Sequence, residues 1–462
     1  MTIWQPKSED IKRPAYRSLA SSAIRAIEKG WLKPGDRLPT HRALSYDLGI
    51  SVQTVSRAYE ELNRLGYTSG EVGRGTFVAH AQRDARTPFL RESQYDRIID
   101  LSILKPVVDE FQMRHMRRAL ADLGEDLPAA DILSFRPNAY TRKHRETAIG
   151  WLEDCGVTTH PDAVVLTNGN TPAMTVALMS AAKPGELVAT EELSHHTLTL
   201  LTRYLGLRIT GIAIDSEGII PEAFEDSCRN NRVRVLYVMP NGTNPKLAIM
   251  SAGRRAEICR IAADHDVRIV ENDAWGPLRD KRPDSFATLA PERTYYFTSF
   301  TKCLMPGLRT GYLVVPEHMI SSVTNRHMVT NWTATPIMAE IAARMLSDGT
   351  ANILLDWQMK ALARRRQIAN EELAGVTHIS IAGGLHVWIP LPSEWDEDTF
   401  VNRARQMGVA VAPGSVFEIS GAGRHRGVRV CIGPESVERL RQGLRSIASI
   451  VRSEPEPALL TI

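Results

Sequence analysis

From about residue 100 onward, short segments rich in β-branched and aromatic residues alternate with longer stretches typical of helices. The strand-like segments include DAVVLT, VRVLYVMP, VRIVEND and TYYFTSF. Strands separated by helix-length connections are typical of a mainly parallel sheet, because parallel neighbours need a crossover between them. The sequence therefore predicts a large α/β domain over residues 100–462. The segments HVWIPLP, GVAVAPG and GVRVCIGP predict a smaller lobe within it, from about residue 385.

The first 80 residues have a different pattern. Apolar residues recur at helical spacing between positions 14 and 30, Thr40 can cap a second helix that ends at Gly49, and Ser51 can cap a third. The segment YTSGEVGRGTFV has glycines at its centre and predicts a β-hairpin. We expect residues 1–79 to form an α+β helix-turn-helix domain and the polar, arginine-rich residues 80–99 to form a linker. The inward face of the third helix is expected to consist of Val52, Val55, Ala58, Tyr59, Leu62 and Leu65.

The excess of positive over negative charge lies entirely at the N-terminal end of the chain. The formal net charge is only +3, yet residues 1–80 carry 12 Lys and Arg against 8 Asp and Glu. This asymmetry is typical of a small DNA-binding module attached to a nearly neutral body. Polar side chains of the third helix could read bases, although a solvated position on a small domain explains any one of them equally well. The candidate DNA contacts are Arg42, Ser51, Gln53, Thr54, Arg57 and Arg74.

Several classes of protein are disfavoured by the composition. The five cysteines are scattered and form no C-x-x-C pair, which argues against a disulfide framework and against a metal site. No apolar stretch is long enough for a membrane span, and MTIWQPKSED does not resemble a signal peptide. We therefore expect a soluble, cytoplasmic protein with no membrane partner and no bound metal.

One group of residues in the α/β domain could hold a cofactor. In VVLTNGNTPAM, Thr171 can cap a helix whose N-terminus, after a strand and a glycine turn, makes a phosphate cradle. Asp273 ends the strand VRIVEND, where a buried carboxylate needs a cationic partner such as a protonated pyridine nitrogen. Lys302 follows the strand TYYFTSF, and Arg309 lies seven residues later. A lysine between a phosphate loop and a carboxylate is the arrangement that forms a Schiff base with pyridoxal phosphate, although a lysine after a strand is unremarkable alone.

The N-terminal segment resembles a known family of DNA-binding domains. The stretch LPTHRALSYDLGISVQTVSRAYEELNRLGY, followed by VGRGTFV, is similar to the winged helix-turn-helix of the GntR regulators. The resemblance implies that the third helix enters the major groove and that the tip of the wing reaches the minor groove. Val52 stands where this family usually has an arginine, so that arginine's contact is not expected here.

The remainder resembles the fold-type I aminotransferases over roughly residues 100–450. The resemblance rests on the ordered series N-G-N-T, T-N-P, N-D-A-W, S-F-T-K with a following arginine, and G-V-R. It implies that Lys302 forms the internal aldimine, that Asp273 pairs with the pyridine nitrogen, and that Asn244 hydrogen-bonds the ring 3-oxygen. It further implies that the phosphate is held by Asn170, Thr171, Ser299 and Arg309.

The same resemblance implies a place for an effector. Arg429 matches the arginine that binds a substrate carboxylate. Trp275 stands where relatives have a tyrosine, so the bond between that tyrosine's hydroxyl and the cofactor is not expected here. Either His195 or His196 is a candidate to stack on the cofactor ring. In such folds the site lies at a dimer interface, and Tyr140 is a candidate contribution from the partner.

Both halves together resemble the MocR subfamily of bacterial regulators. This resemblance implies a pyridoxal-phosphate-dependent homodimer that binds an operator in double-stranded DNA and senses a small amino compound, which displaces Lys302 to form an external aldimine. Among named members, regulators of ectoine uptake and breakdown resemble the chain most, with taurine or 4-aminobutyrate regulators next. The ectoine resemblance points to diaminobutyrate or its acetylated derivative as the effector. The alternative is a working aminotransferase, because the same cofactor chemistry serves both activities.

Overall fold

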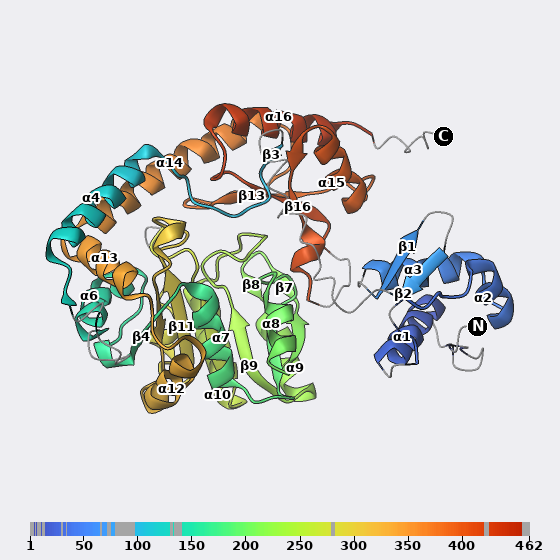
Figure 1. The fold of residues 1–462 in the computed structure, drawn as a ribbon, viewed down its shortest axis with the longest axis horizontal. Coiled ribbons are helices and arrows are strands. Elements are labelled where there is room, and N and C mark those ends of the chain that lie inside the picture. The colour runs from blue at the N-terminus through green and yellow to red at the C-terminus, as the bar shows by residue number, and fades with distance from the viewer. Residues whose placement is uncertain are drawn as a thin grey trace. The chain divides into compact units, whose positions relative to one another are not determined.

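The computed structural model divides the chain into two compact units, Met1–Gln94 and Tyr95–Ile462 (Figure 1). The structure describes residues 4, 6, 11, 14–28, 31–33, 35–64, 67–71, 75–78, 98–129, 133, 141–278, 282–419 and 425–454. Arg74, Tyr140 and nearly all of the predicted linker therefore lie outside the described residues.

The first unit contains the three predicted helices and the predicted hairpin. Thr40 caps the second helix by accepting from Ala43 N, and Gly49 ends that helix in the left-handed conformation. Ser51 Oγ accepts from Thr54 N at 3.1 Å and so caps the third helix, as predicted. The elements are α1 (Ala15–Glu28), α2 (His41–Leu48), α3 (Val52–Arg64) and the antiparallel strands β1 (Thr68–Glu71) and β2 (Gly75–Val78).

The predicted inward face of α3 needs one correction. Val55, Ala58, Tyr59 and Leu62 are buried in the core of the first unit, against α1 and α2. Val52 is 44% exposed; as the first residue of the helix it is covered less than the apolar residues further along α3. Leu65 lies outside the described residues.

The second unit is built around a seven-stranded sheet in the order β4-β12-β11-β10-β9-β5-β6. All neighbouring strands are parallel except at β12, which runs antiparallel to both β11 and β4. The predicted mainly parallel α/β sheet is thus confirmed. The strands are β4 (Val164–Thr167), β5 (Leu187–Glu191), β6 (Arg208–Ile212), β9 (Val233–Val238), β10 (Arg268–Asn272), β11 (Thr294–Ser299) and β12 (Gly311–Val314).

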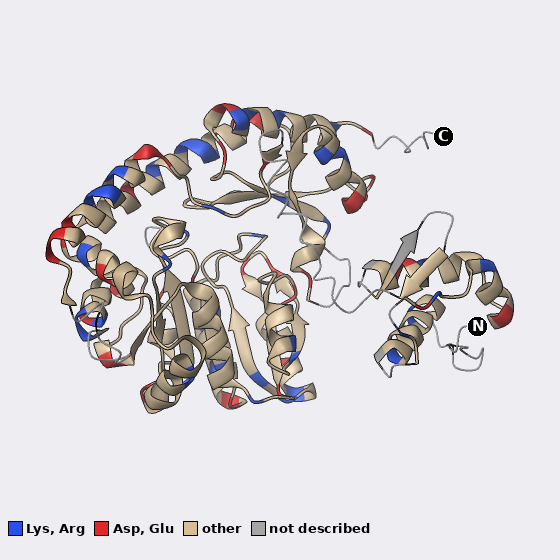
Figure 2. Cartoon of the chain, viewed as in Figure 1, with Lys and Arg blue, Asp and Glu red and all other residues tan. Residues whose placement is uncertain are grey.

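Helices cover the sheet and supply most of the charged surface. Helix α7 packs against β10, β11 and β12, and its side chains are largely buried. Charged residues gather on outer helices such as α14, whereas β11 and β12 carry none (Figure 2). The helices of this part are α4 (Glu110–Asp126), α6 (Thr141–Asp154), α7 (Asn170–Ala181), α8 (Leu198–Tyr204), α9 (Pro221–Asn230), α10 (Ala252–Asp264), α11 (Phe286–Leu289), α12 (Ile320–Asn331), α13 (Pro336–Ser347) and α14 (Thr350–Glu372), with a small hairpin β7 (Ile214–Asp215) and β8 (Gly218–Ile219).

A smaller α/β lobe follows the long helix α14. Its strands are β13 (His386–Pro390), β14 (Val409–Ala410), β15 (Ala412–Pro413) and β16 (Gly427–Cys431), and its helices are α15 (Glu397–Gln406) and α16 (Val437–Arg452). Strand β14 pairs in parallel with β3 (Ile99–Asp100) from the start of the second unit. The lobe therefore includes chain from both ends of this unit, which the sequence pattern did not indicate.

The described residues can be searched for membrane-spanning helices and for groups of side chains that could bind a metal. Among these residues, no helix is long and apolar enough to cross a membrane, and no group of His, Cys, Asp or Glu side chains could hold a metal ion. All five cysteines are free thiols.

Candidate functional site

Lys302 lies just past the end of β11, at the carboxyl edge of the central sheet. Its Nζ donates to the carbonyl oxygen of Leu104, which belongs to the segment that follows β3. Burial is the main cause that lowers the pKa of Lys302 to about 8; the effect of Cys431 opposes it, and the positive charges of Arg429 and Arg309 add to it. A lysine with such a pKa has a substantial neutral fraction near neutral pH, which a nucleophilic amine requires.

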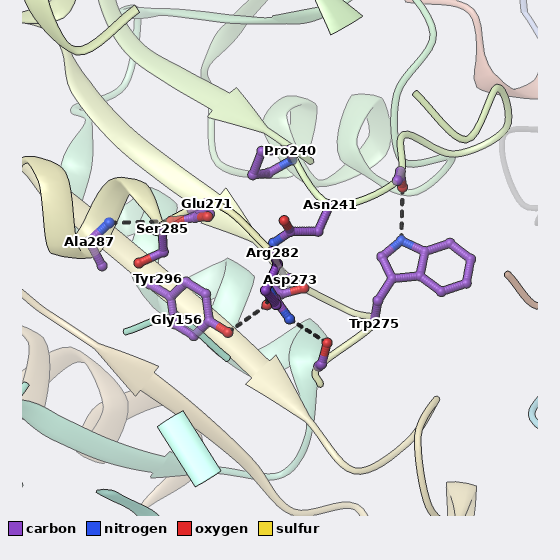
Figure 3. A network of polar contacts seen from close by, with 12 residues as sticks. Gly156, Pro240, Asn241, Glu271, Asp273, Trp275, Arg282, Ser285, Ala287 and Tyr296 are labelled. Atoms are coloured by element: carbon purple, nitrogen blue, oxygen red, sulfur yellow. Dashed lines mark hydrogen bonds and ion pairs between the residues drawn. The ribbon is translucent and has the colours of Figure 1, made fainter. Parts of the chain in front are cut away.

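Asp273 follows the neighbouring strand β10 and is fully buried. Its Oδ2 accepts a 2.7 Å hydrogen bond from the Tyr296 hydroxyl and forms an ion pair with Arg282 (Figure 3). Its Oδ1 has no partner among the described residues. The buried carboxylate thus has a cationic partner within the chain, Arg282, and keeps one oxygen free.

The segment that we predict to hold a phosphate lies where β4 leads into α7. The helix begins at Asn170 with Gly169 as its N-cap, so the expectation that Thr171 caps it is wrong. Gly169 has a φ of +87°, and a Cβ there would lie 2.7 Å from Nη2 of Arg309, which donates to Asn168 O at 2.9 Å. A glycine is therefore needed for the guanidinium to reach the start of the helix. The unbonded N–H groups of this first turn favour an anion.

Arg429 reaches across from the smaller lobe, on strand β16. It is buried, and its Nη1 donates to Asn244 Oδ1 at 3.0 Å while its Nη2 donates to Ser102 O at 2.7 Å. Its guanidinium carbon lies 4.8 Å from the centroid of the Phe417 ring. Asn244 and Arg429, predicted to contact the cofactor and the effector respectively, are thus direct neighbours.

The two aromatic candidates are placed differently. The indole N–H of Trp275 donates to Gly242 O at 2.8 Å, and the ring packs 5.8 Å from that of His386. His195 stacks on His196 with the ring centroids 4.7 Å apart. Burial, followed by the charges of His196, Lys302 and Arg429, lowers the pKa of His195 to about 3. His195 is therefore a neutral ring at physiological pH, suitable for stacking.

The buried polar atoms without partners test whether a cofactor fits here. Buried polar groups in folded proteins nearly always have hydrogen-bond partners, so a partnerless polar atom is available to a bound molecule or to water. Among the described residues, Asp273 Oδ1, Asn170 Oδ1, Ser299 Oγ and Arg429 Nε are such atoms. With the amine of Lys302 and the helix start at Gly169, they fit a molecule that carries a ring nitrogen, a phosphate and an electrophilic carbon. Thr171 is exposed at the same helix start. Together with Asn244, Arg309, Tyr296 and Arg282, these residues form what we call the cofactor site.

Three features of this site were not indicated by the sequence. Arg282 lies in an irregular segment nine residues after Asp273, with no periodicity to reveal it. Tyr296 belongs to a predicted strand, and only the register with β10, where it lies opposite Glu271, shows that it approaches the end of that strand. The carbonyls of Ser102 and Leu104 come from a segment that the sequence did not assign to the site.

The candidate DNA contacts in the first unit differ in how free they are. Gln53 and Arg42 are exposed, on α3 and α2. Ser51 and Thr54 bond each other through their hydroxyl groups at 2.8 Å, within the cap of α3. The guanidinium carbon of Arg57 lies 4.6 Å from the centroid of the Tyr16 ring. These contacts engage Ser51, Thr54 and Arg57 within the first unit, although Ser51 and Arg57 are exposed to solvent as well.

Comparisons with known proteins match both units. Residues 96–447 match the family model "Aminotransferase class I and II", and residues 15–78 match "Bacterial regulatory proteins, gntR family". The HTH-type transcriptional regulator YdeF of Bacillus subtilis is 26% identical over 96% of this chain and 95% of its own length. The HTH-type pyridoxine biosynthesis transcriptional regulator PdxR of Corynebacterium glutamicum is 23% identical over 94% of this chain and 95% of its own. The crystal structure of Pyrococcus horikoshii kynurenine aminotransferase superposes with a TM-score of 0.70 and 22% identity, over 77% of this chain and 91% of that one.

Proposed function

The chain belongs to the class I and II aminotransferases and begins with a GntR-type helix-turn-helix, and on this basis we propose that it is a pyridoxal-phosphate-dependent transcriptional regulator of the MocR type. One observation carries the proposal: a lysine with a lowered pKa lies among partnerless buried polar atoms, in the same chain as a DNA-binding domain. Relatives that match nearly the whole chain are named as transcriptional regulators, which supports this function over catalysis.

Each residue of the cofactor site has a task that follows from its chemistry. Pyridoxal phosphate, when bound, supplies an aldehyde carbon that reacts reversibly with primary amines. Lys302 offers such an amine, Asp273 Oδ1 would accept the ring N–H, and Asn244 would hold the 3-oxygen. The phosphate would be held by the first turn of α7 with Asn170, Thr171, Ser299 and Arg309. His195 is proposed to stack on the ring, and Trp275 to line the effector's side of it.

The effector we propose is a small primary amine that carries an acidic group. A primary amine can replace Lys302 at the cofactor carbon, and the planar guanidinium of Arg429 suits a carboxylate or sulfonate. Arg429 already has the Asn244 amide as a partner, so an acidic group would join or displace that contact. Diaminobutyrate and its acetylated derivative belong to this class and are the first compounds to test.

We further propose an arrangement for the whole protein. Residues 1–79 bind an operator in double-stranded DNA, residues 80–99 link them to the effector-binding residues 100–462, and two chains form a homodimer in the cytoplasm. The basic excess of the first 80 residues supports the DNA partner.

A working aminotransferase is the second candidate. Two observations favour it. The residues available to hold the cofactor are those that a catalyst would need, and the second unit shares its fold with an aminotransferase. The attached helix-turn-helix has no role in such an enzyme, which makes this the weaker candidate.

A spectrum of two variants tests the cofactor assignment. We expect the purified protein to bind pyridoxal phosphate with a visible absorbance band, and Lys302→His to lose that band while it keeps its fold and some DNA binding. Lys246→Ala is the matched control, because Lys246 is another half-buried lysine of lowered pKa, placed beside His425. An unchanged band in Lys302→His would show that another lysine carries the cofactor and would contradict the proposal.

A further inference from the structure

Asp273 shares its charge with two side chains of the protein before any ligand is considered. Arg282 pairs with Oδ2 and also donates to Gly276 O, which fixes the guanidinium in place (Figure 3). The Tyr296 hydroxyl donates to the same Oδ2. The side chain of Arg282 is only 8% exposed, so little solvent screens this ion pair.

We propose that Arg282 is a positioning residue that draws part of the negative charge of Asp273 away from the cofactor ring, so that the ring nitrogen is protonated less firmly. The inference rests on the proposed function, because it assigns the free Oδ1 of Asp273 to the ring nitrogen. An opposite charge stabilises the ionised form of a carboxylate, and a carboxylate stabilised in this way is a weaker proton acceptor. The positive charge of Arg282 also opposes a second positive charge on the nearby ring.

This sharing of charge has a consequence for what the site does. A protonated ring withdraws electrons from a bound amine and so promotes cleavage of bonds in that amine. A ring whose nitrogen is protonated in a smaller fraction of molecules withdraws electrons less strongly. Reversible binding of the amine does not require bond cleavage. Arg282 therefore favours a site that binds amines over one that converts them.

Other titratable groups face Asp273, and they set the background for a measurement. These are the thiols of Cys155 and Cys303, whose pKa values are raised mainly by burial, together with Arg255 and Glu271. Burial raises the pKa of Glu271 to about 7, so this group changes charge in the physiological range. The charge of Arg282 opposes this rise, so the loss of Arg282 also favours the neutral form of Glu271, and the difference between variants includes that response.

The test is the protonation of the ring nitrogen in the full-length protein. Pyridoxal phosphate labelled with ¹⁵N in the ring is bound, and the nitrogen chemical shift is followed from acid to alkaline pH. We expect Arg282→Leu to raise the midpoint of this titration by roughly one to three pH units. Tyr296→Phe should raise it by less, because a neutral donor is lost. Arg282→Lys should keep the wild-type midpoint. The control Arg260→Leu removes an arginine that is paired with Asp264 at the exposed surface, and it should also keep the wild-type midpoint.

An unchanged midpoint in Arg282→Leu, with the labelled cofactor bound, would overturn the inference and leave the proposed function intact. Should Arg282→Leu fail to fold, Tyr296→Phe decides, and a midpoint equal to that of the wild type overturns the inference. Failure of the wild-type protein to take up the labelled cofactor would contradict the proposed function itself, and the inference with it.

Discussion

In the proposed function, Lys302 has to lose a proton before its nitrogen can bond to the cofactor. Because burial lowers its pKa from 10.5 to about 8, the charged form is favoured below about pH 8 and the neutral form above it. At pH 7 about a tenth of the molecules then carry the neutral amine, against fewer than about one in a thousand for an unperturbed lysine. The environment of this one residue therefore prepares the site to react near neutral pH.

The lowered pKa of Lys302 predicts how the rate of loading with the cofactor depends on pH. The rate of covalent attachment, followed by absorbance after rapid mixing, should rise from pH 6 and level off above about pH 8. Lys302→Ala, which can hold the cofactor only without a covalent link, serves as the control for titration of the phosphate group. A rate that still rises steeply above pH 9 would show that Lys302 has its ordinary pKa.

Some residues of the site are predictable from sequence because they follow strand ends. Asp273 comes directly after β10 and Lys302 comes three residues after the end of β11, and the carboxyl ends of these parallel strands meet at one edge of the sheet. The need of Asp273 for a cationic partner is also predictable, since an unpaired buried carboxylate is unfavourable. Arg282 could not be chosen from the sequence as that partner, because the path of residues 274–282 depends on tertiary packing.

At the scale of elements, the start of α3 combines a helix cap with the candidate DNA surface. Ser51 and Thr54 are engaged in the cap, while Gln53 is exposed beside them. The caps of α2 and α3 follow local rules and are predictable from the sequence. The exposure of Val52 is not predictable, because helical spacing alone places it on the apolar face, whereas the packed structure leaves its side chain partly exposed.

Two substitutions at this helix start should separate stability from recognition. Ser51→Ala should lower the free energy of unfolding of the first unit by about 1 kcal/mol, because the cap is lost. Gln53→Ala should leave that stability within about 0.5 kcal/mol of the wild type and weaken binding to DNA by about 1 to 3 kcal/mol. Thermal unfolding and fluorescence anisotropy, with a duplex selected by the wild-type protein, measure the two effects. Wild-type affinity in Gln53→Ala would remove Gln53 from the DNA surface.

In the whole molecule, the proposed DNA-binding and cofactor sites lie in different units of one chain. The α/β class and the helix-turn-helix are predictable because both follow local periodicity and turn residues. The return of β3 to the smaller lobe is not predictable, since it pairs residues about 310 positions apart along the chain. If an amine alters the affinity for DNA, thermodynamic linkage requires DNA to alter the affinity for the amine by the same factor.

One titration tests most directly whether binding of an amine at the cofactor changes the affinity for DNA. Diaminobutyrate, and other small amino acids in parallel, is added to the full-length protein loaded with pyridoxal phosphate and bound to its selected duplex, in the presence of a keto acid. Cofactor absorbance, DNA affinity and amino-group transfer are recorded together. We expect one such amine to shift the absorbance and, over the same concentration range, to change DNA affinity by about 5- to 150-fold. We expect no sustained conversion of the keto acid. An absorbance shift with constant DNA affinity and rapid conversion of the keto acid would contradict the account and identify an aminotransferase.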